Sequence, residues 1–259
     1  MTPAELMFIA SEAARVGGST ILASGRTREA VEKSAGDYVT AVDGASERAI
    51  AGFLSRATPD IPLVGEERGG VAMDRYWLVD PLDGTTNFLH GFPIVGVSVA
   101  LVEEGRPTVG VVHAPFLRET YAAAAGAGAT VERADGTSER LEVGRRPVER
   151  SVVGTGFPFR RKEVLPRYFR AMVVALERFE DLRRPGAAAL DLAWVAAGVF
   201  DGFFELALGP WDVAAGAVLI QEAGGTVTDW VGAPGILSGD ILAGSPAVHA
   251  ELLRIAAET

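Results

Sequence analysis

Apolar residues near the N-terminus recur at helical spacing. Leu6, Ile9, Ala13 and Val16 follow one another at intervals of three or four residues, which predicts an amphipathic helix. The segment Thr2-Pro3-Ala4-Glu5 precedes them and combines a capping threonine, a proline in the first turn and a glutamate three residues after the threonine. These are the features of a helix start. The first helix is therefore expected to begin there.

The next elements are a helix and two short strands. The helix is expected to run from Thr40 to about Leu54. The polar stretch before it, residues 25–37, is expected to be a loop or a mobile arm. Short apolar runs at residues 62–64 and 76–79 predict strands, and each is followed closely by acidic residues.

The rest of the chain changes character near residue 145. Residues 94–132 contain apolar runs separated by turn-forming residues, which predicts an antiparallel meander. Beyond residue 145, strand-like and helix-like runs alternate, as is typical of an α/β layer. We therefore expect one compact catalytic unit with an N-terminal α+β half (1–145) and a C-terminal α/β half (146–259). The later strand-like runs are 151–154, 202–206 and 225–229, and the helix-like runs are near 160–179, 188–197, 213–223 and 247–257.

Composition excludes several classes of protein. The chain has 259 residues, of which 48% are hydrophobic, and 34 acidic residues outnumber 24 basic ones. The net charge of -10 argues against a general nucleic-acid or anionic-membrane binder, because such surfaces need excess Lys and Arg. The absence of cysteine excludes disulfides, thiolate metal sites and cysteine nucleophiles.

Neither a targeting segment nor a membrane span is expected. The N-terminal stretch carries Glu5 and Glu12 where a signal peptide would have a basic start and an uncharged apolar run. The longest apolar stretches, such as residues 192–200, are far shorter than the ~20 residues that span a bilayer. A cytoplasmic location is therefore expected.

The densest group of reactive residues lies within residues 77–88. An apolar strand delivers Asp80 and Asp83, and Pro81 and Gly84 force a turn, so that both carboxylates face one point with the Leu82 carbonyl between them. Magnesium prefers such oxygen ligands and commonly adds substrate phosphate. The backbone of residues 84–86 can present N–H groups to an anion. This combination indicates phosphoryl chemistry. The alternative is that both aspartates only form a turn or cap a helix.

Other polar residues have simpler explanations when each is taken alone. Glu66-Glu67 after a strand is consistent with a solvated turn, and Asp212 and Asp43 are consistent with helix capping. Lys33 is one of two lysines in an arginine-rich chain. The three histidines have no metal-ligand spacing, and neither a G-x-S-x-G elbow nor a nucleotide-binding G-x-x-x-x-G-K-[ST] loop is present.

Together these motifs resemble the inositol monophosphatase family. Residues 80–88 (DPLDGTTNF) resemble its first signature, and residues 211–216 (WDVAAG) followed by 222–225 (EAGG) resemble its second. Lys33, Asp43 and Glu66-Glu67 precede them in the family's order. The resemblance covers nearly the whole chain, and residues 154–159 and 188–198 are most similar to the bacterial inositol-1-monophosphatase branch.

The resemblance implies a layered αβαβα sandwich, shared with fructose-1,6-bisphosphatases, and a homodimer. It also implies two Mg²⁺ ions per subunit, a weaker third one near Glu67, and sensitivity to lithium. The implied metal ligands are Glu66, Asp80, the Leu82 carbonyl, Asp83 and Asp212. The implied catalytic residues are Thr85, Asp43, Glu67 and Lys33. The implied substrate contacts are Leu82, Asp83, Gly84, Thr85, Gly186, Ala187, Ala188, Glu205 and Asp212.

The implied reaction is hydrolysis of inositol-1-phosphate to myo-inositol and phosphate by a metal-activated water. Thr85 would orient this water, and Asp43 would accept a hydrogen bond from Thr85. Ala187 stands where the family commonly has Ser or Thr, so one side-chain hydroxyl contact is lost. The expected partner is a small phosphorylated polyol or sugar, without nucleic acid or membrane.

Two alternatives to this function remain. The same chemistry could act on fructose-1,6-bisphosphate, histidinol phosphate or a nucleotide 2′- or 3′-phosphate. Alternatively, the chain could be a non-catalytic regulatory binding protein that keeps this fold.

Overall fold

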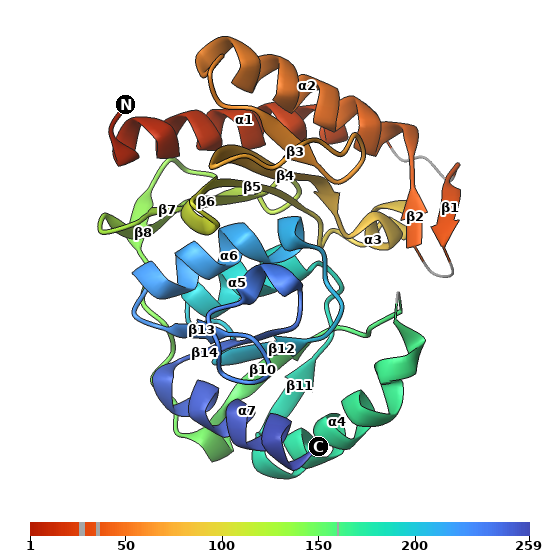
Figure 1. Cartoon of the computed structure of the whole chain (residues 1–259), viewed down its shortest axis with the longest axis vertical. Helices are drawn as coiled ribbons and strands as arrows, with labels where there is room; N and C mark the ends of the chain where they lie inside the picture. Colours follow the sequence, from red (N-terminus) through yellow and green to blue (C-terminus); the bar gives the residue numbers. More distant parts are fainter. Residues whose placement is uncertain (26–28, 35–36, 160) are drawn as a thin grey trace.

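Helices and sheets alternate in five layers along the longest axis of the molecule (Figure 1). The computed structural model describes residues 1–25, 29–34, 37–159 and 161–259, without the side chains of residues 33, 34 and 37. Helices α1 and α2 form one outer layer, and α4 and α7 form the other. The pair α5 and α6 lies between the two large sheets. The predicted αβαβα sandwich is confirmed.

The helices are α1 (Pro3–Ala23), α2 (Ala41–Ala57), α3 (Thr85–His90), α4 (Leu165–Arg178), α5 (Ala188–Ala196), α6 (Pro210–Glu222) and α7 (Pro246–Glu258). The strands of the first half are β1 (Val31–Ser34), β2 (Asp37–Val39), β3 (Leu63–Gly65), β4 (Arg75–Asp83), β5 (Gly96–Glu103), β6 (Arg106–Ala114), β7 (Glu119–Ala124), β8 (Gly128–Glu132) and β9 (Ser138–Arg140). Those of the second half are β10 (Val152–Thr155), β11 (Asp181–Arg183), β12 (Gly202–Glu205), β13 (Thr226–Thr228) and β14 (Ile241–Gly244).

The first large sheet contains seven strands in chain order, β3 to β9. Strand β3 is parallel to β4 and every later pair is antiparallel, so the predicted meander is confirmed. The sequence predicts that the strand turns after Asp80, but in the structure β4 does not turn there. It continues to Asp83 with a register shift against β5, where Asp80 pairs with Ser98 and Asp83 with Gly96. Pro81 cannot donate a ladder hydrogen bond, which favours a bulge at this point.

The second large sheet has the strand order β11-β10-β12-β14-β13. Strands β11, β10 and β12 are parallel, whereas β14 runs antiparallel to both of its neighbours. The sequence pattern does not predict β11 or β14, although it does predict strands of the same length such as β10 and β13.

The expectation of a loop or mobile arm between the first two helices is wrong for part of that segment. Strands β1 and β2 pair there in an antiparallel hairpin, with Val31 opposite Val39. Residues 26–28 and 35–36 lie outside the described part of the chain. Such short strands carry too few alternating positions to be recognised from sequence.

Helix α1 has the predicted capping box, because the Thr2 and Glu5 side chains each accept from the other's backbone N–H. Among the described residues it is the one helix long and apolar enough to cross a membrane by length and composition. However, 44% of its apolar window is buried, and the helix packs against α2, β5 and β6. This packing accounts for its apolar residues.

Candidate metal and phosphate site

Three aspartates converge where the first sheet meets the central helices. Asp80 and Asp83 lie on β4, and Asp212 lies in the first turn of α6. One carboxylate oxygen of each lies within 4.8 Å of the others. The bulge in β4 allows both of its aspartates to reach this point, and α6 packs against β4 to bring the third.

The electrostatics of this cluster favour a bound cation. Asp80 is 1% exposed. Burial raises the pKa of Asp80 well above its usual value, and the neighbouring carboxylates of Glu66, Asp83 and Asp212 raise it further. Buried carboxylates this close together require protons or a cation to offset their charge. The donor set consists of oxygen atoms alone, so these residues fit a hard divalent ion such as Mg²⁺.

The Thr85 hydroxyl links this cluster to Asp43. Its Oγ1 donates to Asp43 Oδ1 at 3.0 Å and lies 3.2 Å from the Leu82 carbonyl oxygen. The other oxygen of Asp43, Oδ2, accepts from the Thr40 backbone N–H at 2.9 Å and from the Thr40 hydroxyl at 2.5 Å. Burial raises the pKa of Asp43 in spite of these hydrogen bonds. Asp43 therefore caps α2 with one oxygen and orients Thr85 with the other.

Gly84 occupies a position that needs glycine. It has a φ of 90°, and a Cβ there would lie 2.9 Å from the Ile94 carbonyl oxygen. This left-handed residue turns the chain from β4 into α3, which begins at Thr85. The glycine of the DGTT sequence is thus explained by its backbone conformation, because the chain turns there next to the carboxylates.

The second half of the chain supplies the opposite wall of the cavity. Gly186 and Ala187 directly precede α5, Ala188 begins it, and Glu205 ends β12. The Ala189 backbone N–H donates to Asp83 Oδ2 at 2.7 Å, which ties α5 to the first signature. The Asp212 carboxylate accepts from the Gly209 backbone N–H at 2.7 Å and so caps α6.

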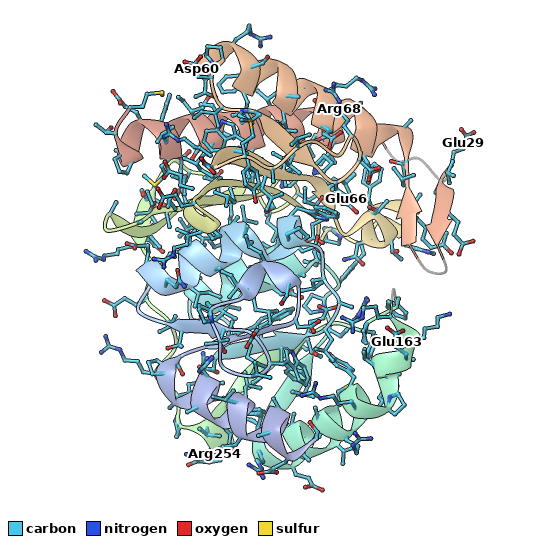
Figure 2. All side chains as sticks on the ribbon, in the orientation of Figure 1. Glu29, Asp60, Glu66, Arg68, Glu163 and Arg254 are labelled. Atoms are coloured by element: carbon cyan, nitrogen blue, oxygen red, sulfur yellow. The ribbon has the colours of Figure 1, made fainter. Side chains whose placement is uncertain are left out.

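A single cavity of about 340 Å³ contains most of the predicted site residues. Figure 2 shows Glu66 at the same end of the first sheet as α3. The predicted metal and substrate residues lining the cavity are Glu66, Asp80, Leu82, Asp83, Gly84, Thr85, Gly186, Ala187, Ala188, Glu205 and Asp212.

The remaining predicted residues lie elsewhere. Asp43 lies behind Thr85, and Glu67 is half-buried outside the cavity lining. The Lys33 side chain lies outside the described part of the structure. The catalytic roles expected for these residues therefore stay predictions.

Several cavity residues were not predicted. Tyr38, Phe157, Phe159, Arg184 and Asp191 also line the cavity. The Arg184 guanidinium lies 5.3 Å and 5.6 Å from the ring centres of the two phenylalanines. Residues 154–159 carry part of the family resemblance, but the sequence alone did not show that Gly156, Phe157 and Phe159 line the same cavity as the aspartates.

Glu47 is a further residue that sequence reasoning missed. It is fully buried on α2, and its Oε1 accepts from the backbone N–H groups of Glu67 at 3.1 Å and Arg68 at 3.3 Å. A Cβ on Gly65 would lie 1.8 Å from this oxygen. Glu47 therefore holds the loop that carries Glu66 and Glu67. Its position four residues after Asp43, on the same helix face, was the available signal.

Comparison with known proteins gives one consistent family. The inositol monophosphatase family model matches residues 2–259. The protein named Nus factor SuhB from Pasteurella multocida is 40% identical over 96% of this chain and 94% of its own. The extragenic suppressor protein suhB from Bartonella henselae is 36% identical, with a TM-score of 0.90 over 97% of this chain and 98% of that one.

A third relative is named for its activity. The structure of the inositol monophosphatase from Anabaena (Nostoc) sp. PCC 7120 has a TM-score of 0.87 and 35% identity over 98% of this chain and 96% of that one. The match to the family model and the likeness to these relatives extend over almost the whole chain, including both segments that carry the aspartates. The chain belongs to the inositol monophosphatase family.

Proposed function

We propose that the protein is a magnesium-dependent phosphate monoesterase that converts inositol-1-phosphate to myo-inositol and phosphate. The observation that carries this proposal is the meeting of Asp80, Asp83 and Asp212 in one cavity, beside the Thr85–Asp43 hydrogen bond. A non-catalytic protein has no need to bury several carboxylates together next to a hydroxyl that an acid orients. Membership of a phosphatase family supports the same reaction.

In this proposal Asp80, Asp83, Asp212 and Glu66 hold Mg²⁺ together with the Leu82 carbonyl. The ion, when bound, would neutralise the phosphate charge and favour ionisation of water. The remaining tasks belong to the chain. The Thr85 hydroxyl donates a hydrogen bond to Asp43, which leaves the Thr85 oxygen able to accept a hydrogen bond from the attacking water. The Gly84–Thr85 backbone holds the phosphate.

The polyol would lie against the wall formed by the second half of the chain. Glu205 is buried and lines the cavity, so its carboxylate can accept hydrogen bonds from sugar hydroxyls. Ala187 contributes no hydroxyl, and the backbone of residues 186–188 remains available. The proposed catalytic set also includes Lys33 and Glu67, and the weaker third ion would lie near Glu67.

The proposal is tested by measuring phosphate release from four esters: inositol-1-phosphate, fructose-1,6-bisphosphate, histidinol phosphate and adenosine 3′,5′-bisphosphate. Magnesium is titrated, and lithium is added at fixed magnesium. We expect release that depends on magnesium, favours inositol-1-phosphate and is suppressed by lithium. Asp80→Asn should abolish turnover rather than raise KM. Near-normal kcat in that variant at saturating magnesium would refute the assignment of Asp80 as a metal ligand. Preference for a different ester would change the assigned substrate but not the assigned chemistry.

The name of the relatives supports a second candidate. Several are called Nus factor SuhB, a name that denotes regulation rather than a substrate. We therefore also propose a regulatory role for the fold, through a macromolecular partner, and the expectation that the chain binds no nucleic acid stays a prediction. A stable complex that Asp83→Ala leaves intact, with no phosphate release from any ester, would favour this role.

The homodimer and the cytoplasmic location are also proposals. Light scattering on the purified protein should give twice the 27.2 kDa mass of the chain. A mass equal to that of one chain would contradict the homodimer.

A further inference from the structure

Asp191 is a buried carboxylate in the cavity wall that the proposed mechanism does not use. It lies in the first turn of α5 and is 1% exposed. Asp191 lines the same cavity as the three clustered aspartates. Within the described part of the chain, its Oδ1 atom has no hydrogen-bond partner. Buried polar atoms are normally paired, so an unpaired one in a cavity wall needs an explanation.

Helix capping does not provide that explanation. An acidic residue in the first turn of a helix can bind the free backbone N–H groups there. In α5, however, the Asp83 carboxylate accepts from the Ala189 N–H, while the Asp191 backbone N–H bonds to the Ala187 carbonyl in the ordinary helical way. Neither of these two hydrogen bonds at the start of α5 involves the Asp191 carboxylate.

The surroundings of Asp191 make an unpaired carboxylate oxygen unfavourable. Burial raises its pKa well above the usual value, and the carboxylates of Asp83 and Glu205 raise it further, whereas the Arg184 guanidinium lowers it. Asp83 and Glu205 are both substrate contacts in the proposed function. A hydrogen-bond donor brought by a ligand would relieve the cost of burial.

We propose that Asp191 is a substrate-binding residue whose carboxylate accepts a hydrogen bond from a hydroxyl of a phosphorylated polyol. This inference rests on the proposed function and narrows its substrate class. Glu205 and Asp191 together offer acceptors to two hydroxyls of one ring, from the end of β12 and the start of α5. A phosphate ester without hydroxyls gains nothing from either carboxylate. Asp191 also supplies a polar group one helical turn beyond Ala187, where the hydroxyl expected of the family is missing.

The test compares two substitutions on two esters. Asp191→Ala removes the acceptor, and Asp191→Asn keeps an amide oxygen of the same size in its place. The esters are inositol-1-phosphate and p-nitrophenyl phosphate, which has no hydroxyl, both at saturating magnesium. We expect Asp191→Ala to raise KM for inositol-1-phosphate at least tenfold and to leave kcat/KM for p-nitrophenyl phosphate within twofold. Asp191→Asn should recover most of the loss. Asp181→Asn, an aspartate on β11 outside the cavity lining, serves as the matched control.

Other outcomes overturn the inference. An equal loss on both esters with a lower melting temperature would show that Asp191 is structural. An unchanged KM for inositol-1-phosphate would show that it does not contact the substrate. If the wild type hydrolyses neither ester, the proposed function itself fails, and binding of inositol-1-phosphate is then measured by calorimetry. In that case Asp191→Ala must weaken binding of inositol-1-phosphate at least fivefold. Unchanged binding in the variant, or undetectable binding to the wild type, overturns the inference.

Discussion

At the residue scale, the same side chains carry both local structure and the candidate chemistry. Asp43 caps α2 through Oδ2 and binds Thr85 through Oδ1. Asp212 caps α6 while facing Asp80 and Asp83. The capping explanation and the functional one therefore do not exclude each other. Because a carboxylate has two oxygens, one can fix the helix start while the other faces the cavity.

Glu47 gives a prediction at this scale. Glu47→Ala should raise the magnesium concentration for half-maximal phosphate release roughly tenfold, because two backbone N–H groups next to Glu66 lose their acceptor, at a cost of about 1–2 kcal/mol. Glu47→Gln retains an oxygen acceptor and should restore most of the magnesium response. A magnesium titration of all three proteins measures this effect. The prediction is wrong if Glu47→Ala responds to magnesium like the wild type.

At the element scale, long helices were easier to predict than short strands. Helices α1 and α2 have capping boxes that can be recognised directly in the sequence, and their apolar spacing extends over several turns. Strands β1, β11 and β14 have three or four residues each. So few residues show no period, and pairing with neighbours decides their conformation. The bulge in β4 is a similar case, because it exists only relative to β5.

His113 on β6 gives a prediction about element packing. Its ring lies against Gly18 of α1, and its Nδ1 is 3.0 Å from the Thr120 hydroxyl. Burial, and then the charge of Arg15, lower the pKa of His113 from 6.5 to about 4. The folded state thus binds fewer protons than the unfolded state between these values. The contribution of the neutral His113 ring to the free energy of unfolding is complete above pH 6.5 and is lost as the pH falls toward 4.

Between pH 7.5 and pH 5.5 this difference amounts to about 1 kcal/mol of unfolding free energy. The variant His113→Gln should lose that much less stability than the wild type over the same interval. Urea denaturation at both pH values measures the difference. Identical pH dependence of the two proteins would show that His113 is charged, or not buried, in the folded state.

At the scale of the whole molecule, the candidate site belongs to neither half of the chain. Glu66, Asp80 and Asp83 come from residues 1–145, whereas Glu205 and Asp212 come from residues 146–259. Helix α6 contacts β4, β5 and β6 of the first sheet and β13 and β14 of the second, and so connects the two halves. A cation held by carboxylates from both halves would therefore stabilise the entire fold.

Magnesium should raise the melting temperature of the wild type. At one hundred times the dissociation constant, a ligand of the folded state adds about 2.7 kcal/mol, which corresponds to roughly 5–10 °C for a chain of this size. Asp212→Asn keeps an oxygen that can cap α6 but removes one carboxylate from the cluster. It should melt no lower than the wild type without magnesium and lose most of the magnesium response. Scanning fluorimetry tests this, and a full magnesium shift in the variant would contradict the ligand assignment.

The sequence by itself determined the family, the layered fold class and the residue types of the site. Ordered motifs such as DPLDGTTNF and WDVAAG specify local backbone and donor chemistry, which depend on neighbours in the chain. Only the tertiary structure decided which residues share the cavity. Asp191 was indistinguishable from other helical acids until packing buried it beside Asp83, and the spacing of Glu47 from Asp43 did not show that packing would bury it beneath Gly65. Burial and pairing across more than a hundred residues, as between Asp83 and Ala189, arise from the packing of layers, which no local pattern encodes.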